Sequence, residues 1–383
     1  MTPPMLPKEV VDTMASRGHR LHHWLWHEVR NSWLSYPEDV RQQIRDLGWE
    51  PPRPALNERR RPILENNAGE DFLYMHRRML VDVSAILNRV KDPAYPRVRV
   101  WSVPPPPGDP DFPVPPAWFD PTVGIDEKDR RSGFETLQRI KSDIFYKKRM
   151  TYWQRLFTDH GFLRGISLGE LGTLMESTIH ASMHLRWASP PAGSRPEPGP
   201  AEGHTIDSKW DDPRYDFLGD TYSSHVHPVF WSLHGWIDDR IEDWKIANGV
   251  YGNEFWKGTW AGPWPGEEPP PPPGPPPLPP PDPQPLPDQA PSPPHASPHE
   301  PPAASGAQPA ADLPVPTPAE SEGPSPDAHQ TPGHRGTSDG VPAAAAPAPH
   351  HADPAQLEEA VAIIGRCGIF HSGYASVLSR PTG

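Results

Sequence analysis

Apolar side chains recur at helical spacing in several segments of this 383-residue chain. Between residues 10 and 44, Leu25, Val29 and Trp33 follow one another at intervals of four, which predicts an amphipathic helix. The same periodicity predicts further helices over 71–90, 133–157, 168–187, 227–248 and 357–364. Alternating patterns typical of strands are sparse, so the sequence predicts a mainly α fold with long loops.

Proline interrupts this pattern unevenly. Of the 60 prolines, 32 lie between Pro263 and Pro349, in a stretch otherwise rich in Ala, Ser and Glu. Such a stretch cannot bury enough apolar surface to offset the entropy of ordering it, so we expect residues 263–350 to form a disordered linker. The chain then divides into a helical domain over 1–262, this linker, and a short helical and aromatic tail over 351–383. The Pro-rich arm is also a candidate ligand for a partner protein.

The charge balance narrows the classes of function. Lys and Arg number 36 against 49 Asp and Glu, giving a net charge of −13 that argues against nucleic-acid or anionic-membrane binding. One cysteine, Cys367, excludes an intramolecular disulfide, and the chain starts without an apolar signal segment. We therefore expect a soluble cytoplasmic protein, and export together with a partner protein stays open. The 19 histidines direct attention to metal binding.

Three histidines occur at spacings that suit a metal site. His180 and His184 lie four residues apart on a predicted helix and can share one ion, although such pairs often bind no metal. Ala181 stands where zinc proteases of the H-E-x-x-H type carry their general base, so a zinc hydrolase lacks its base here. His234 lies on an otherwise apolar helix face. It is either a histidine buried in the core or the third ligand of a site that suits copper or zinc.

At this point the chain resembles the tyrosinase family of type-3 copper proteins. That family carries F-L-P-W-H-R in its first copper half-site, and residues 72–77 here read Phe-Leu-Tyr-Met-His-Arg. Its second half-site has a helical His-x-x-x-His followed by D-P-x-F-W-x-x-H-x-x-x-D, which His180, His184 and residues 228–238 match in the same order. The match spans about 66–245. Residues 29–39 also look like the segment that opens many bacterial members, closest to the branch that includes the tyrosinase of pyoverdine siderophore maturation.

The resemblance implies a tyrosinase-like helical bundle with its metal site at the centre. In the family, two copper ions, each held by three His, use dioxygen to oxidise phenols or catechols to quinones. For this chain the implied substrate is an aromatic small molecule or a peptide, as in natural-product or siderophore maturation. The resemblance assigns His180, His184 and His234 to one copper ion and His76 to the other.

The first copper half-site departs from the family pattern. Asn67 occupies the position nine residues before His76 where the family has a His, and no His occurs between Glu28 and Met75. His23 and His27, which share a helix face, or the adjacent His22 could supply the missing imidazoles, or all three could simply decorate a Trp-rich helix. The count of one or two coppers stays open. The alternative function is a non-oxidative metal- or oxygen-binding protein, or a scaffold, with an incomplete first site.

Two further positions bear on the reaction. Family tyrosinases that hydroxylate monophenols often have Asn directly after the first His of the second half-site, where this chain has Ala181. Oxidation of a diphenol or an aminophenol is therefore easier to support than monophenol hydroxylation. Asp238 either accepts a hydrogen bond from a ligand imidazole or pairs with Arg240.

The tail suggests a form of regulation. Several family members are kept latent by a C-terminal segment that inserts a side chain over the copper pair. Phe370 and Tyr374 end a long tether here and are candidates for such a placeholder, in which case deleting residues 351–383 raises oxidase activity. The alternative is a short motif that binds a partner protein.

Overall fold

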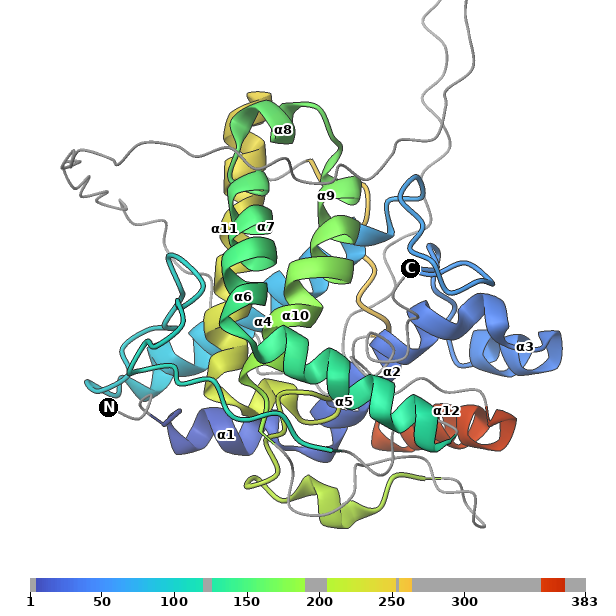
Figure 1. The fold of residues 1–383 in the computed structure, drawn as a ribbon. Coiled ribbons are helices and arrows are strands. Elements are labelled where there is room, and N and C mark those ends of the chain that lie inside the picture. The colour runs from blue at the N-terminus through green and yellow to red at the C-terminus, as the bar shows by residue number, and fades with distance from the viewer. Residues whose placement is uncertain (1–4, 120–125, 190–204, 253–254, 264–352, 369–383) are drawn as a thin grey trace, which may run out of the picture. The chain divides into compact units, whose positions relative to one another are not determined.

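The computed structural model describes residues 5–119, 126–189, 205–252, 255–263 and 353–368. These residues are mainly helical, as the periodicity predicts, and within them no β-strand occurs (Figure 1). The α-helices are α1 (Lys8–Met14), α2 (Arg17–Ser32), α3 (Glu38–Asp46), α4 (Ala68–Val90), α5 (Glu127–Lys141), α6 (Asp143–Phe145), α7 (Thr151–Leu156), α8 (His160–Arg164), α9 (Leu168–Met175), α10 (Ala181–Trp187), α11 (Pro228–Asn248) and α12 (Pro354–Cys367). Short 3₁₀ turns η1 (Trp33–Ser35), η4 (Ser208–Asp211) and η5 (Ser224–Val226), and π-helical turns η2 (Tyr146–Met150) and η3 (Glu176–His180), complete the set.

Local chemistry explains where the helices begin and break. The helical region expected over 10–44 is divided into α1, α2 and α3, with Pro37 directly before α3. The segment expected over 133–157 is also divided, because Ser142 ends α5 and its side chain accepts a hydrogen bond from the Phe145 amide at the start of α6. At α11, Pro228 occupies the first turn and Gly249 ends the helix with φ +64°. The pattern thus predicted helix content better than helix boundaries.

Helices α4 and α9 cross with their backbones in contact. A Cβ atom added to Gly172 of α9 would lie 2.1 Å from the carbonyl oxygen of Gly69, and one added to Gly69 would lie 2.1 Å from the carbonyl oxygen of Gly169. Only glycine fits at such a crossing. The close approach brings α4, which carries His76, against the helix that continues toward His180.

That second helix is continuous but not uniform. After α9, η3 forms one π-helical turn over Glu176–His180, and α10 follows without a break. Single π-turns inside helices occur frequently at functional sites, because they change which side chains share a face. Here the π-turn ends on His180, so the irregularity lies at the start of the predicted histidine pair.

The C-terminal helix α12 belongs to the same compact unit as α1–α11. It packs against α2 and α3, and Leu357, Val361 and Ile364 are fully buried in the main hydrophobic core. Glu358 forms an ion pair with Arg17 at the start of α2. The tail therefore contributes core side chains beside the helix that carries His23 and His27.

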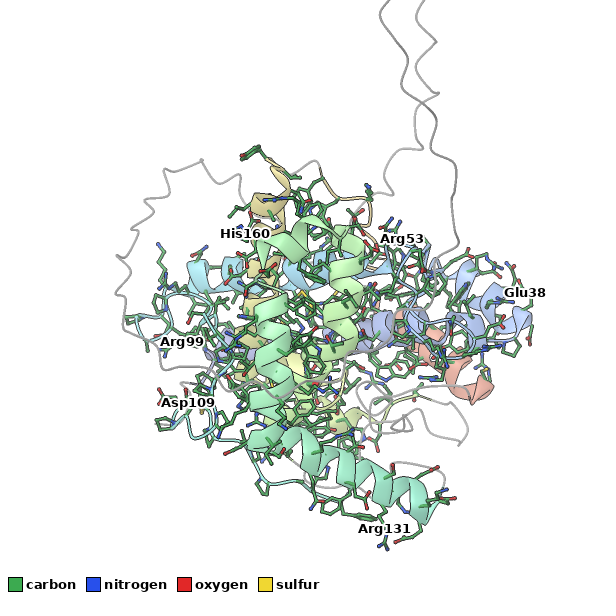
Figure 2. The ribbon with its side chains drawn as sticks, turned by 45° about the horizontal axis from the view of Figure 1, so that its top comes forward. Glu38, Arg53, Arg99, Asp109, Arg131 and His160 are labelled. Carbon is green, nitrogen blue, oxygen red and sulfur yellow. The ribbon has the colours of Figure 1, made fainter. Side chains whose placement is uncertain are left out.

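The side chains at the surface differ in kind from those that fill the core. The labelled side chains Glu38, Arg53, Arg99, Asp109, Arg131 and His160 lie at the periphery of the fold (Figure 2). The interior holds five fully buried tryptophans, including Trp26 and Trp231, together with several buried histidines. Among the described helices, none is both long and apolar enough to cross a membrane.

Candidate metal centre

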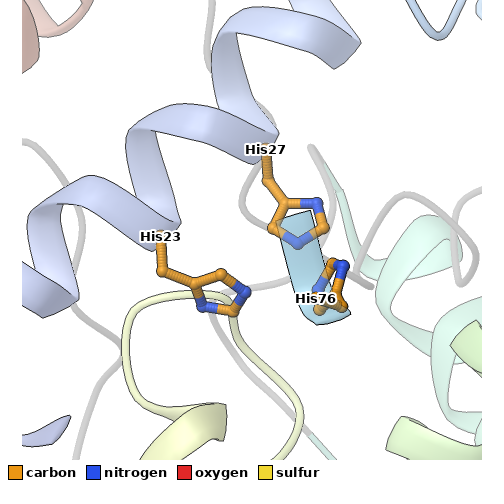
Figure 3. A group of neighbouring side chains, drawn as sticks. All are labelled: His23, His27 and His76. Atoms are coloured by element: carbon orange, nitrogen blue, oxygen red, sulfur yellow. The ribbon is translucent and has the colours of Figure 1, made fainter. Parts of the chain in front are cut away.

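Helix α2 presents two buried imidazoles on one face. His23 and His27 are one turn apart, so both rings point to the same side of the helix, where they meet His76 of α4 (Figure 3). Their side chains are 0% and 4% exposed. The neighbouring His22 lies against Trp49 instead, with ring centroids 5.3 Å apart. The structure thus brings His23 and His27 to His76 and directs His22 toward the Trp49 side chain.

His76 completes this α2–α4 group, defined as His23, His27 and His76. Its Nδ1 lies 2.8 Å from the carbonyl oxygen of Phe72, one turn earlier in α4, which leaves Nε2 to face the other two rings. One ring nitrogen from each of the three residues lies within 4.8 Å of the others, close enough to surround one metal ion. The Nε2 atoms of all three are buried and have no hydrogen-bond partner among the described residues. Buried polar atoms are nearly always partnered, so three converging unpartnered nitrogens fit a metal.

The second set, called here the α10–α11 group, is His180 at the end of η3, His184 of α10 and His234 of α11. The Nε2 atoms of His180 and His234 are 3.1 Å apart. Two nitrogens that each bind one ion at about 2.0 Å with a tetrahedral angle lie about 3.3 Å apart, so this separation suits a shared ion. The His184 ring centroid is 4.5 Å from that of His180 and 5.3 Å from that of His234. All three side chains are at most 1% exposed.

The two groups adjoin each other at His76. The His76 and His234 rings stack with centroids 4.4 Å apart, and ring nitrogens of His76, His180 and His234 also lie within 4.8 Å of one another. His76 offers only one nitrogen, because Nδ1 is engaged by the Phe72 carbonyl. His76 can therefore bind only one of two ions. If it binds the ion of the α2–α4 group, the other ion needs a third imidazole besides His180 and His234, and His184 is adjacent to both.

Backbone carbonyls fix the ring orientations in the α10–α11 group. The Nδ1 of His184 lies 2.8 Å from the Leu218 carbonyl oxygen, and the Nδ1 of His234 lies 2.9 Å from that of Phe230. Since a carbonyl oxygen only accepts hydrogen bonds, Nδ1 carries the proton and Nε2 keeps its lone pair. Each ring is thereby prepared to bind a metal through Nε2.

Burial keeps the six imidazoles neutral. It lowers the pKa of His76 and His184 to about 3, partly offset by the backbone hydrogen bonds of their rings. Burial also lowers the pKa of His23, His27, His180 and His234 well below the ordinary value, helped by the neighbouring imidazoles. Neutral imidazole is the form that binds metal ions, so the centre needs no proton release at neutral pH.

Arg30 ties together the helices that carry the ligands. Its fully buried guanidinium donates to both carboxylate oxygens of Glu176, at 2.9 and 3.2 Å, and to the Ala68 carbonyl oxygen at 2.8 Å. These bonds join α2 to the π-turn η3 and to the start of α4. The positive charge of Arg30 also contributes to the lowered pKa of His27 and His76.

Other predicted positions have structural partners. Asp238 is bound by Arg77 at 2.7 and 3.2 Å, and Arg240 pairs with Asp243, so the expected pairing of Asp238 with Arg240 or with an imidazole is replaced by one with Arg77. The reason is that Arg77 follows His76 on α4 and reaches the facing α11. The predicted placeholders Phe370 and Tyr374 lie outside the described residues.

Asn67 and Ala181 also serve packing. Asn67 is the cap of α4 with a left-handed φ of +61°, and it lies against Gly169 of α9. Ala181 is buried in a small apolar cluster with Leu137 and Ile140 of α5. Neither position therefore extends the metal centre.

Sequence reasoning missed His225. This residue of η5 is fully buried, and its Nδ1 lies 2.9 Å from Nδ1 of His23. Its place three residues before α11 follows no spacing typical of metal ligands, and a buried histidine that contacts a metal-binding histidine instead of the metal has no sequence signature.

No protein family matches the chain, and no curated protein matches it.

Proposed function

We propose that this protein is a copper-dependent oxidoreductase that uses dioxygen to oxidise a phenol- or catechol-type ring to a quinone. The observation that carries the proposal is the convergence of six buried imidazoles. Ring nitrogens of His23, His27 and His76 lie close enough to share an ion, and so do those of His76, His180 and His234. The His184 ring lies beside His180 and His234, so a second group of three is complete when His76 serves the first. The stacked His76 and His234 rings put the two groups next to each other. We assign one copper ion to each group.

The donor set favours copper over other metals. Both groups consist of imidazoles, which suit copper and zinc, whereas calcium and magnesium prefer oxygen ligands. A hydrolytic zinc site needs a general base for its water, and the carboxylate that the sequence suggested beside the histidines, Asp238, is bound by Arg77. A copper pair supplies reversible electron transfer to dioxygen when bound.

The residues of the chain orient the ligands and exclude water. Backbone carbonyls keep the His76, His184 and His234 rings in the form that offers Nε2. Ala181 packs toward α5, so it places no proton acceptor beside His180. A catechol or an aminophenol, which needs no ring hydroxylation, is therefore the substrate class that we propose.

One observation favours a second candidate, a protein that binds metal and dioxygen without oxidising an external ring. The six imidazoles are at most 4% exposed, a degree of burial that admits dioxygen more readily than an aromatic ring. Turnover of a catechol separates the two candidates.

The test is copper loading of the purified full chain. We expect two coppers per chain and oxidation of a catechol under air. The variant His27→Ala should bind one copper and lose the oxidation, and the resting cupric protein should gain the electron paramagnetic resonance signal of an isolated ion. His22→Ala is the matched control on the same helix and should keep two coppers. One copper per wild-type chain would overturn the proposal, and two coppers without catechol oxidation would select the second candidate.

A further inference from the structure

His225 uses both ring nitrogens in the interior of the protein. Its Nε2 lies 3.0 Å from the carbonyl oxygen of Met14, at the end of α1. Its Nδ1 lies 2.9 Å from Nδ1 of His23. Both rings are 0% exposed, which disfavours a charged form. His225 therefore connects a backbone carbonyl of α1 to a residue of the α2–α4 group.

The two hydrogen bonds fix the position of each proton. The Met14 carbonyl only accepts, so the Nε2 of His225 must carry a hydrogen. A neutral imidazole has one N–H, so Nδ1 of His225 is an acceptor, and Nδ1 of His23 must donate to it. The lone pair of His23 is then on Nε2, the buried nitrogen that has no hydrogen-bond partner within the described part of the chain and faces His27 and His76 (Figure 3).

The Nδ1 partner of His23 is a side chain, whereas the other candidate ligands with a known Nδ1 partner use backbone carbonyls. Backbone carbonyls hold His76, His184 and His234, and those acceptors cannot be removed by mutation. A backbone hydrogen bond with Thr221 also acts on the His23 ring. His225 is the side chain that hydrogen-bonds Nδ1 of His23, and unlike a backbone carbonyl it can be replaced by mutation.

We propose that His225 is a positioning residue that holds His23 as an Nε2 ligand for a metal in the α2–α4 group. This inference rests on the proposed function, because it concerns a ligand of the same centre. It goes further in assigning a role to a residue outside both groups of three histidines. Partners of this kind typically contribute about 10- to 100-fold to metal affinity.

The first test needs no metal and no turnover. Long-range ¹H–¹⁵N spectra of the metal-free full chain, labelled with ¹⁵N-histidine, report which nitrogen of each ring is protonated. We expect the proton on Nδ1 of His23 and on Nε2 of His225, with His23→Gln and His225→Asn used to assign the signals. A proton on Nε2 of His23 would overturn the inference, whatever the outcome of the copper experiments.

The second test measures affinity with Zn²⁺, which binds without redox chemistry. In His225→Leu we expect one of two zinc ions to bind about 10- to 100-fold more weakly in competition with a chelator. His225→Asn, whose amide oxygen can accept from His23, should stay within about threefold of wild type, and His22→Leu is the matched control. Unchanged zinc affinity in folded His225→Leu would refute the role of His225, and if that variant fails to fold, the spectra of the wild-type chain decide.

Discussion

Replacing Arg30 by Met should destabilise the protein strongly, because Arg30 is a buried cation at the junction of three helices. The side chain is 0% exposed, and Glu176 is 17% exposed. Methionine keeps a similar length but removes the donor to both oxygens of the Glu176 carboxylate and the added bond to the Ala68 carbonyl oxygen. The guanidinium also lies 4.2 Å from the Trp26 ring centroid, and that contact is lost as well.

The magnitude follows from the burial of the pair. Removing one partner of a buried ion pair costs about 3–5 kcal/mol, because the other charge stays buried and uncompensated. The slight exposure of Glu176 favours the lower end, so we expect a loss of about 3 kcal/mol in the free energy of unfolding. With urea m-values of about 1–3 kcal/mol/M, the midpoint should fall by about 1–3 M.

Equilibrium urea denaturation of the metal-free protein at pH 7.5, followed by circular dichroism and tryptophan fluorescence, measures this loss. Arg45→Met is the control, because Arg45 forms its 2.9 Å ion pair with Glu50 at the surface, and its loss should leave the urea midpoint nearly unchanged. A double-mutant cycle with Glu176→Gln isolates the energy of the pair. A loss below about 1 kcal/mol for Arg30→Met would refute the view that this pair holds the ligand helices together.

Three further outcomes are expected. Gly172→Ala should cost about 3 kcal/mol or more, because its Cβ would lie 2.1 Å from backbone of α4; wild-type stability by thermal denaturation would contradict this crossing. Leu357→Ala in α12 should cost about 2–5 kcal/mol, against under 0.5 kcal/mol for the exposed Gln356→Ala, and equal melting temperatures would mean that α12 is dispensable. Burial lowers the pKa of His76 and His184 to about 3, so the unfolded chain takes up protons near pH 6.5 that the folded chain refuses. The contribution of these two rings to the free energy of unfolding of the metal-free protein is therefore complete above pH 6.5 and is lost as the pH falls toward 3. Between pH 7.5 and 5.5 we expect a loss of about 3 kcal/mol for the two rings together. Urea midpoints that do not change over this range would contradict the expectation.

The helices and the histidine pairs were accessible from the sequence because both depend on local spacing. A spacing of four determines that His23 and His27 share a face, and that His180 and His184 do, without knowledge of any other helix. It does not determine which face meets the other helices. His22 is as close to the predicted site in sequence as His23, and only the packing of α2 directs it to Trp49.

The parts that sequence reasoning could not supply are contacts between distant segments. Arg30 and Glu176 are 146 residues apart, and neither position alone indicates a buried pair. Asp238 was expected to pair with an imidazole or with Arg240, both close in sequence, yet Arg77, 161 residues earlier, binds it. The glycine crossing of α4 and α9 is another contact of this kind, because a glycine in a helical pattern does not reveal its partner. The metal centre therefore depends on two kinds of information: the ligands follow local spacing, whereas their convergence depends on contacts between distant segments, such as the backbone crossing of α4 and α9. A mutation at the crossing should accordingly disturb metal binding without changing any ligand.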